Sequence, residues 1–327
     1  MAKNAVITGW GCYVPSRVLT NADLERIVDT SDEWITSRTG IKERRIASDE
    51  ETTSFMSARA GRAALEKAHL RAQDVQLVIV GTCSPDYLFP ATACLVQTEL
   101  GATRAGAFDV EAACTSFITA LAIARGMIVS GAVQNALVIG AEILTRYVDY
   151  TDRSTCVLFG DGAGAAVLGP VGANRGILAA RIRSDGRYEE QLYAPGGGTK
   201  GGFSAETIAR GDHFFKMKGN EVFKVAIRSM TDIAIEVLDE AGLKTDDVNL
   251  FIPHQANQRI TDAVASKLKV DSSKVYSNIA MHGNTSSASI PIGLDECVES
   301  GRITTGDVIL MASFGGGITW GGVVMRW

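Results

Sequence analysis

The sequence predicts an α/β fold made of two similar halves, and three observations support this prediction. Segments with helical periodicity alternate with short apolar segments typical of buried strands, which predicts sheets covered by helices. The chain has 327 residues, which is more than a single hydrophobic core usually accommodates. The third observation is an internal repeat. The expected helices are 53–69, 115–130, 232–242 and 256–269, and the expected strands are 75–80, 106–110, 135–140, 165–168, 248–252 and 307–313.

The repeat relates residues 64–80 to residues 237–253. The two segments align without a gap at an offset of 173, and seven aligned positions are identical. Any two helix–loop–strand units resemble each other, but seven identities exceed that general likeness. A duplication predicts two α/β halves related by a pseudo-twofold axis, which we place at residues 1–174 and 175–327. At an offset of 170, Cys114 falls on Asn284, so we expect both residues at equivalent helix N-termini.

Composition and charge exclude several classes of protein. The net charge is -5, so no overall basic field points to nucleic acid. No apolar run approaches the length of a membrane span, and residues 1–10 show no charged-then-apolar leader, so we expect a cytoplasmic protein without a membrane segment. The six cysteines are scattered without a Cys-x-x-Cys pair, so neither a zinc site nor a redox pair is expected.

One of the six cysteines occupies a distinctive position. Cys114 follows the expected strand 106–110 and directly precedes the expected helix 115–130. A thiol at a helix N-terminus experiences the positive end of the helix dipole and unpaired N–H groups, which favour the thiolate. Most free cysteines are buried and inert. The helix-start position nevertheless predicts that Cys114 is a nucleophile.

Two further segments carry partners for such a nucleophile. His254 lies between the expected strand 248–252 and the expected helix 256–269, in a more constrained setting than His69 or His213. Asn284 could simply cap a helix. Because its amide donates hydrogen bonds and does not ionise near neutral pH, it can also stabilise a developing negative oxygen beside a neutral histidine.

Two glycine-rich segments have different interpretations. Glycines 315–317 follow the last expected strand and allow backbone N–H groups to approach a substrate, so these amides and that of Cys114 are candidates for an oxyanion hole. A plain glycine-rich turn is compatible with the same residues. Residues 160–165 resemble a dinucleotide-binding fingerprint, but a short strand follows instead of a helix. We therefore interpret Asp161-Gly162 as a tight hairpin turn.

Together these motifs resemble β-ketoacyl-acyl-carrier-protein synthase III, a family of condensing enzymes in the thiolase-like superfamily. The resemblance extends over essentially the whole chain, from residues 30–41 to Trp320. It implies a thiolase-like fold, an obligate-type homodimer and no metal or redox cofactor, since the coenzyme A thioester is a substrate. It implies that the enzyme initiates fatty acid synthesis by decarboxylative Claisen condensation of an acyl-coenzyme A primer, acetyl-coenzyme A first, with malonyl-acyl carrier protein through an acyl-cysteine.

The resemblance also implies roles for individual residues. The catalytic triad falls on Cys114, His254 and Asn284, and the oxyanion hole on the backbone of Cys114 and Gly316. Contacts to coenzyme A are expected at Trp34, Arg38 and Arg153. The acyl pocket is expected to include Phe159 together with Phe89 of the partner subunit.

A basic segment after His254 is a candidate docking site for the acidic carrier protein. Arg259 and Lys224 match family positions that contact the carrier protein, and Lys267 and Lys269 extend the basic segment. A solvated helix face is the plainer interpretation of such charges. Because the chain itself is net negative, we expect a local patch to steer the carrier protein.

Three other functions remain open on the sequence. A relative in secondary metabolism would share the triad and use a different primer or acceptor. A papain-like Cys-His-Asn hydrolase would use water as the acceptor, but it leaves the duplication and the segment around Trp34 and Arg38 unexplained. A non-catalytic carrier-binding homologue would not need an intact triad. An assay with acetyl-coenzyme A and malonyl-acyl carrier protein distinguishes these functions.

Overall fold

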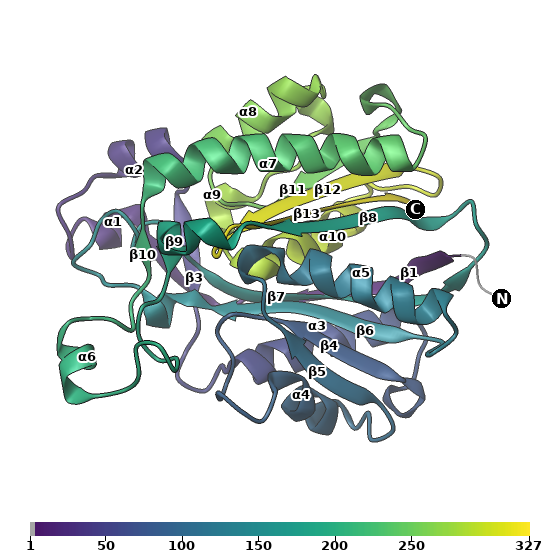
Figure 1. Ribbon diagram of the computed structural model, residues 1–327, viewed down its shortest axis with the longest axis horizontal. Coiled ribbons are helices and arrows are strands. Elements are labelled where there is room, and N and C mark those ends of the chain that lie inside the picture. The colour runs from purple at the N-terminus through teal and green to yellow at the C-terminus, as the bar shows by residue number, and fades with distance from the viewer. Residues whose placement is uncertain (1–3) are drawn as a thin grey trace.

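The computed structural model describes residues 4–327 and contains two large sheets with helices between and outside them (Figure 1). The strand orders are β1-β7-β6-β4-β5 and β11-β12-β13-β8. Residues 1–3, part of the segment expected to lack a leader, lie outside the described residues. The strands are β1 (Asn4–Tyr13), β4 (Leu77–Gly81), β5 (Gly106–Val110), β6 (Ala136–Ile143), β7 (Asp161–Val171), β8 (Gly176–Ser184), β11 (Leu250–Pro253), β12 (Val308–Gly315) and β13 (Thr319–Arg326).

The helices form three layers around these sheets (Figure 1). Helices α5 (Ser116–Val129) and α10 (Ser289–Glu299) lie between the sheets. The outer helices are α3 (Thr53–Lys67) and α4 (Thr92–Leu100) on the first sheet, and α7 (Gly219–Glu240) and α8 (Gln258–Leu268) on the second. The predicted α/β fold, with sheets layered between helices, is confirmed. The smaller elements are β2 (Arg17–Thr20), α1 (Asn21–Leu24), α2 (Asp32–Thr39), β3 (Glu43–Ile46), β9 (Leu192–Tyr193), α6 (Ala205–Ala209), β10 (Lys216–Met217) and α9 (Ile279–His282). None of the helices in residues 4–327 combines the length and the apolarity that crossing a membrane requires.

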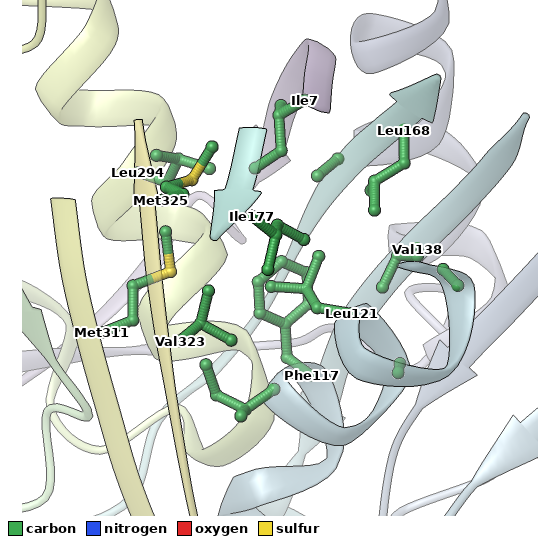
Figure 2. Close-up of a cluster of buried hydrophobic side chains, with 14 of the residues drawn as sticks. Ile7, Phe117, Leu121, Val138, Leu168, Ile177, Leu294, Met311, Val323 and Met325 are labelled. Atoms are coloured by element: carbon green, nitrogen blue, oxygen red, sulfur yellow. The ribbon is translucent and has the colours of Figure 1, made fainter. Parts of the chain in front are cut away.

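The core between the sheets explains why α5 is apolar all round. Its sequence contains one charged residue, Arg125, as expected of a helix covered on both sides. Apolar side chains of α5 and α10 meet those of both sheets in this layer (Figure 2), among them Ile7, Phe117, Leu121, Val138, Leu168, Ile177, Leu294, Met311, Val323 and Met325. Packing of α5 and α10 between the two sheets therefore fixes the positions at which these helices begin.

The internal repeat corresponds to repeated structure at an offset of 173 residues, but not at an offset of 170. Strands β4 and β11 and helices α5 and α10 each begin 173 residues apart. Short 3₁₀ turns precede both central helices, and each begins with a residue in the left-handed region, Ala113 at φ 47° and Ser286 at φ 48°. The alignment of Cys114 with Asn284 at an offset of 170 was therefore wrong, because Ser287 corresponds to Cys114 and Asn284 precedes the turn. The division at residue 174 falls between β7 and β8 and stays a prediction.

The hairpin turn expected at Asp161-Gly162 was also wrong. Asp161 begins β7, and Gly162 lies inside this strand opposite Glu142 of β6. The Asp161 carboxylate is fully buried and accepts hydrogen bonds from the backbone of Ala47 at 2.8 Å and of Thr145 at 3.0 Å. The aspartate therefore anchors neighbouring backbone instead of forming a turn.

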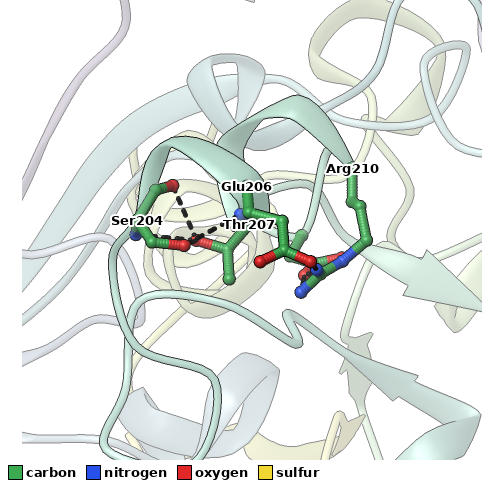
Figure 3. Close-up of polar contacts among 5 residues, drawn as sticks. Ser204, Glu206, Thr207 and Arg210 are labelled. Carbon is green, nitrogen blue, oxygen red and sulfur yellow. Dashed lines mark hydrogen bonds and ion pairs between the residues drawn. The ribbon is translucent and has the colours of Figure 1, made fainter.

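A segment between β8 and α7 extends away from the layered body and carries α6 (Figure 1). Local polar contacts hold α6 together: Ser204 and Thr207 form a capping box, and Arg210 contacts Glu206 at 2.9 Å (Figure 3). Phe203 in this segment is 76% exposed. The segment therefore presents apolar surface that its own fold does not cover.

Candidate active site

Cys114, His254 and Asn284 line one cavity of about 240 Å³. The three residues come from different elements: the 3₁₀ turn before α5, the residue after β11, and the segment after α9. All three are buried. The structure thus brings the predicted triad together, and each side chain has its own set of contacts.

The backbone at Cys114 is held from two sides, and its thiol is buried. The preceding Ala113 adopts a left-handed conformation, and the hydroxyl of Ser313 on β12 donates to the Cys114 carbonyl at 2.7 Å. Burial raises the pKa of the Cys114 thiol to about 12, and the Glu142 charge adds to this effect, while a hydrogen bond with Ser286 acts in the opposite direction. Burial therefore opposes the thiolate that the helix start favours, and the role of Cys114 as the nucleophile stays a prediction.

His254 is neutral and held by its backbone and its ring. Its backbone N–H donates to the carbonyl of Ala312 at 2.9 Å, and Nδ1 lies 2.7 Å from the hydroxyl oxygen of Ser289. Burial lowers the pKa of His254 to about 3. The neutral imidazole agrees with the sequence prediction. Ser289 was not singled out from the sequence, because its contact with His254 joins segments that are far apart in the chain.

Asn284 is oriented by its own turn. Its backbone N–H donates to Leu158 at 2.8 Å, and its side-chain Oδ1 accepts from the backbone N–H of Ser286 at 2.8 Å. Because Oδ1 is occupied, the amide nitrogen is the part of the side chain left to donate to a ligand. The expected donor role fits this orientation.

A buried carboxylate lies behind the site and was missed in the sequence. Glu142 on β6 is fully buried, and burial raises its pKa. It accepts hydrogen bonds from Ser84 at 2.6 Å, from Ser287 at 2.9 Å and from Ser286 at 3.1 Å. These donors come from the loop after β4 and from the 3₁₀ turn before α10, so Glu142 joins both to the first sheet. Sequence periodicity concealed it, because it is the one charged residue in an apolar strand.

The glycine triplet allows β12 to approach the nucleophile. A Cβ atom on Gly315 would lie 2.6 Å from the backbone nitrogen of Cys114, closer than any side chain can be placed. Gly316 follows and lines a second cavity that also reaches Cys114. The backbone of this turn therefore lies beside the Cys114 amide, as an oxyanion hole requires.

Comparison with known proteins identifies the family. The model for 3-oxoacyl-[acyl-carrier-protein (ACP)] synthase III matches residues 108–186, and the model for its C-terminal part matches residues 238–327. The β-ketoacyl-[acyl-carrier-protein] synthase III of Roseiflexus castenholzii is 51% identical over 327 residues, covering 100% of this chain and 99% of that protein. The chain belongs to the β-ketoacyl-[acyl-carrier-protein] synthase III family. The recognised family and the class of acyltransferase expected from the sequence are thereby confirmed.

Solved structures of synthase III share the fold. The crystal structure of 3-oxoacyl-[acyl-carrier-protein] synthase III from Aquifex aeolicus VF5 has a TM-score of 0.92 and 51% identity, covering 99% of this chain and 100% of that one. The priming β-ketosynthase of the R1128 polyketide pathway has a TM-score of 0.91 and 36% identity, covering 99% of this chain and 96% of that one. OleA of Xanthomonas campestris, at 22% identity, shares the fold alone. The predicted thiolase-like fold is confirmed.

The second cavity of this synthase III chain has a volume of about 440 Å³ and is largely apolar near Cys114. Phe159, expected at the acyl pocket, lines both cavities. Phe89 lines neither cavity in its own subunit and is 83% exposed, so its expected role depends on a partner subunit. The other lining side chains near the thiol include Cys83, Leu144, Leu192 and Phe215.

The residues expected to contact coenzyme A lie together, and two of the three line the first cavity. Trp34 and Arg38 line it, and the Arg38 guanidinium lies 5.3 Å from the Trp34 ring centroid. The Arg153 guanidinium lies 5.2 Å from the same ring, and it also donates to the carbonyl of Asp29. The structure therefore groups two cations around one aromatic ring, and their contact with coenzyme A stays a prediction.

The four cationic residues expected at the carrier-protein site do not form one cluster. Arg259, in the first turn of α8, lines the cavity, and its guanidinium lies 5.2 Å from the ring centroid of Phe223 on α7. Lys224 is the next residue after Phe223 and is exposed. Lys267 and Lys269 lie at the opposite end of α8, about 12 Å from Arg259 along the helix axis. The structure therefore separates this set into a group at the cavity and a distant pair.

Proposed function

We propose that this protein catalyses the decarboxylative Claisen condensation of an acyl-coenzyme A primer with malonyl-acyl carrier protein, giving 3-oxoacyl-acyl carrier protein and initiating fatty acid synthesis in the cytoplasm. The observation that carries the proposal is the cavity lined by Cys114, His254 and Asn284 in a synthase III chain. Acetyl-coenzyme A is the proposed primer. The reaction needs no metal or redox cofactor, because amide and imidazole donors stabilise the charge that develops.

The first half-reaction transfers the acyl group to Cys114. The sulfur attacks the thioester carbonyl while the backbone amides of Cys114 and Gly316 hold the oxyanion. A bond forms between sulfur and the acyl carbon, and the bond to coenzyme A breaks. The thiol proton leaves Cys114 and ends on the released coenzyme A thiol. The larger cavity receives the acyl chain.

The second half-reaction forms the carbon–carbon bond. His254 and the side-chain amide of Asn284 donate hydrogen bonds to the malonyl thioester oxygen, so loss of carbon dioxide leaves a stabilised enolate. The enolate carbon attacks the acyl carbon on Cys114, and the cysteine sulfur leaves and takes up a proton. An oxyanion without partners in a buried site would cost several kcal/mol, which is why two donors are needed.

The same cavity also supports a proposal for the partners. Coenzyme A enters past Trp34, Arg38 and Arg153, and the carrier protein docks at Arg259 and Lys224. A homodimer places Phe89 of the partner subunit at the acyl cavity. The exposure of Phe89 in the single chain supports this arrangement.

The direct test incubates the purified protein with radiolabelled acetyl-coenzyme A and malonyl-acyl carrier protein. We expect labelled 3-oxobutyryl-acyl carrier protein and, without the malonyl substrate, label on the Cys114 peptide only. Cys114→Ala is expected to abolish both. Free acetate in place of the condensation product would indicate a hydrolase, and label on another cysteine would contradict the assignment of Cys114.

A second candidate is a condensing enzyme of secondary metabolism with a different primer or acceptor. The likeness to the R1128 priming β-ketosynthase supports it, at lower identity than the likeness to synthase III of Aquifex aeolicus. A panel of straight and branched acyl-coenzyme A primers separates the two candidates. Preference for a longer or branched primer over acetyl-coenzyme A would favour the second.

A further inference from the structure

The hydroxyl group of Ser289 contacts the ring of His254, and the chemistry described above assigns it no role. Ser289 is the first residue of α10, and its Oγ lies 2.7 Å from Nδ1 of His254. The same oxygen accepts a hydrogen bond from the backbone N–H of Gln255 at 3.4 Å. His254 and Ser289 are each 1% exposed, so both groups depend on protein partners.

The direction of these hydrogen bonds follows from what each group can donate. A backbone N–H only donates, so Ser289 uses an oxygen lone pair toward Gln255. If the second lone pair accepted from an Nδ1–H, the hydroxyl hydrogen would have no acceptor, because Nδ1 is the only other partner of this oxygen among residues 4–327. The hydroxyl therefore donates to Nδ1 of His254. Burial keeps the His254 ring neutral by lowering its pKa to about 3. A neutral imidazole that accepts at Nδ1 carries its proton on Nε2.

The Gln255 backbone that donates to Ser289 is itself fixed. The Gln255 side-chain nitrogen donates to the Pro253 carbonyl at 2.8 Å. Its side-chain oxygen accepts from the hydroxyl of Ser277 at 3.1 Å and from the backbone N–H of Asn278 at 3.2 Å. Because both ends of this side chain are bound, the Gln255 N–H keeps its direction toward Ser289.

We propose that Ser289 is a positioning residue that holds His254 as its Nε2–H tautomer, so that the ring nitrogen left for the cavity is a hydrogen-bond donor. The catalytic consequence rests on the proposed function, in which the enolate oxygen needs a donor. A base for the Cys114 thiol would instead need Nε2 without a proton. Ser289 therefore commits His254 to decarboxylation and not to activation of the nucleophile.

The tautomer can be measured without any assay of activity. The chain has four histidines, so ¹⁵N-histidine spectra are simple, and His254→Gln assigns the His254 signals. We expect the wild-type ring to show a protonated Nε2 and an accepting Nδ1. In Ser289→Ala the two nitrogen shifts should move toward each other as the bias is lost. A wild-type ring protonated at Nδ1 overturns the proposal, whether or not the enzyme condenses its substrates.

The two half-reactions provide the second readout. Ser289→Ala should slow malonyl decarboxylation roughly 10- to 100-fold and leave acylation of Cys114 nearly unchanged, while Ser289→Thr, which keeps a hydroxyl, should recover most of the rate. Ser57→Ala is the matched control, because Ser57 is buried on α3 and its hydroxyl has no hydrogen-bond partner among residues 4–327.

The outcomes separate the two proposals. Equal loss of both half-reactions in Ser289→Ala, with unchanged ring shifts, would show a purely structural role and overturn the inference. Absence of decarboxylation by the wild-type protein would defeat the proposed function, while the ring shifts would still decide the role of Ser289. If Ser289→Ala does not fold, the wild-type and Ser289→Thr spectra decide which tautomer of His254 is present and whether the hydroxyl maintains it.

Discussion

At the scale of single residues, the site contains two buried groups, Cys114 and Glu142, that repel each other when both are negatively charged. The pKa of Cys114 is raised by burial and by Glu142, and the pKa of Glu142 is itself raised by burial. A thiolate at Cys114 would place a second negative charge close to the first. The reactivity of the cysteine therefore depends on which of the two groups holds a proton.

Replacing Glu142 by Gln is expected to lower the pKa of Cys114, because the neighbouring negative charge is removed. The pH dependence of alkylation by iodoacetamide should then shift to lower pH. The serine hydroxyls around residue 142 can rotate to accept from the new amide, which helps the variant fold. A shift to higher pH would contradict this expectation and would show that Glu142 accepts the thiol proton. Glu236→Gln, on the surface of α7, is the control.

His254 should make the protein sensitive to acid. Its folded-state pKa of about 3 lies below the usual value of 6.5, so between these values the unfolded chain binds a proton that the folded chain does not. Stability contributed by His254 is fully present above pH 6.5 and is lost as pH falls toward 3. Between pH 6.5 and 5, the wild-type free energy of unfolding should fall by roughly 1–2 kcal/mol more than that of His254→Gln.

Urea unfolding at the two pH values measures this difference. Acidic groups contribute equally to both proteins and cancel in the comparison. His69→Asn, which changes an exposed histidine, should behave like the wild type. An identical loss of stability in wild type and His254→Gln would mean that His254 is not held neutral by burial.

At the scale of elements, the sequence was most informative where strands end and helices begin. Cys114 and His254 were recognisable because each lies at a strand-to-helix junction, where period and composition change together. Glu142 was not, because its partners come from segments far apart in the chain. The tertiary contact of Ser289 with His254 has no local signal either. The alignment at an offset of 170 was wrong because it depended on a few identical polar residues. So short a match does not determine which residues are equivalent, whereas the starts of the helices and strands do.

Gly164 on β7 is required by the close packing of α10 on the first sheet. A Cβ atom there would lie 2.6 Å from the backbone nitrogen of Ile292 and 2.7 Å from the backbone carbon of Pro291, and neither atom can rotate away. Gly164→Ala should destabilise the protein by about 1–3 kcal/mol, measured by urea unfolding. Gly169→Ala in the same strand is the control, because its Cβ would meet only the Thr8 side chain at 3.4 Å. Equal stability of the two variants would contradict the packing.

At the scale of the whole molecule, the net charge and a local basic patch have opposite effects on the approach of an acidic protein. The chain carries a net charge of -5, so its overall field repels an acidic carrier protein. We therefore expect the proposed association with the carrier protein to depend on a local group of cations at the cavity. Salt screens such contacts over about 8 Å at physiological ionic strength.

Arg259→Glu is expected to slow the reaction with malonyl-acyl carrier protein, and the defect should shrink as salt is raised. Acylation by acetyl-coenzyme A should be almost unaffected. Stopped-flow rates at several salt concentrations measure both. Lys267→Glu tests the extent of the patch: an equally large effect would show that the basic segment acts along the whole of α8, as its sequence suggested. Equal harm to both half-reactions by Arg259→Glu would place the docking site elsewhere.

Exposed apolar side chains predict self-association. Tyr87, Leu88 and Phe89 are consecutive and are 60%, 84% and 83% exposed. Contiguous apolar surface of this kind is typical of protein interfaces. Sedimentation should therefore show a wild-type dimer, and Leu88→Asp combined with Phe89→Asp should give monomers. Ile27→Asp, at a separate exposed apolar residue, should remain dimeric. A monomeric wild type at micromolar concentration would remove this expectation.

Cys114 lines both cavities, and this has a kinetic consequence. On the proposed function, an acyl group in the larger cavity leaves the smaller cavity, lined by Trp34 and Arg38, as the approach of the malonyl substrate to the thioester and as the exit of coenzyme A. We therefore expect free coenzyme A to inhibit competitively against the malonyl substrate and noncompetitively against the primer. The rate of initiation should then depend on the ratio of free to acylated coenzyme A, so that the shape of one entrance would link the first step of chain building to the supply of primer.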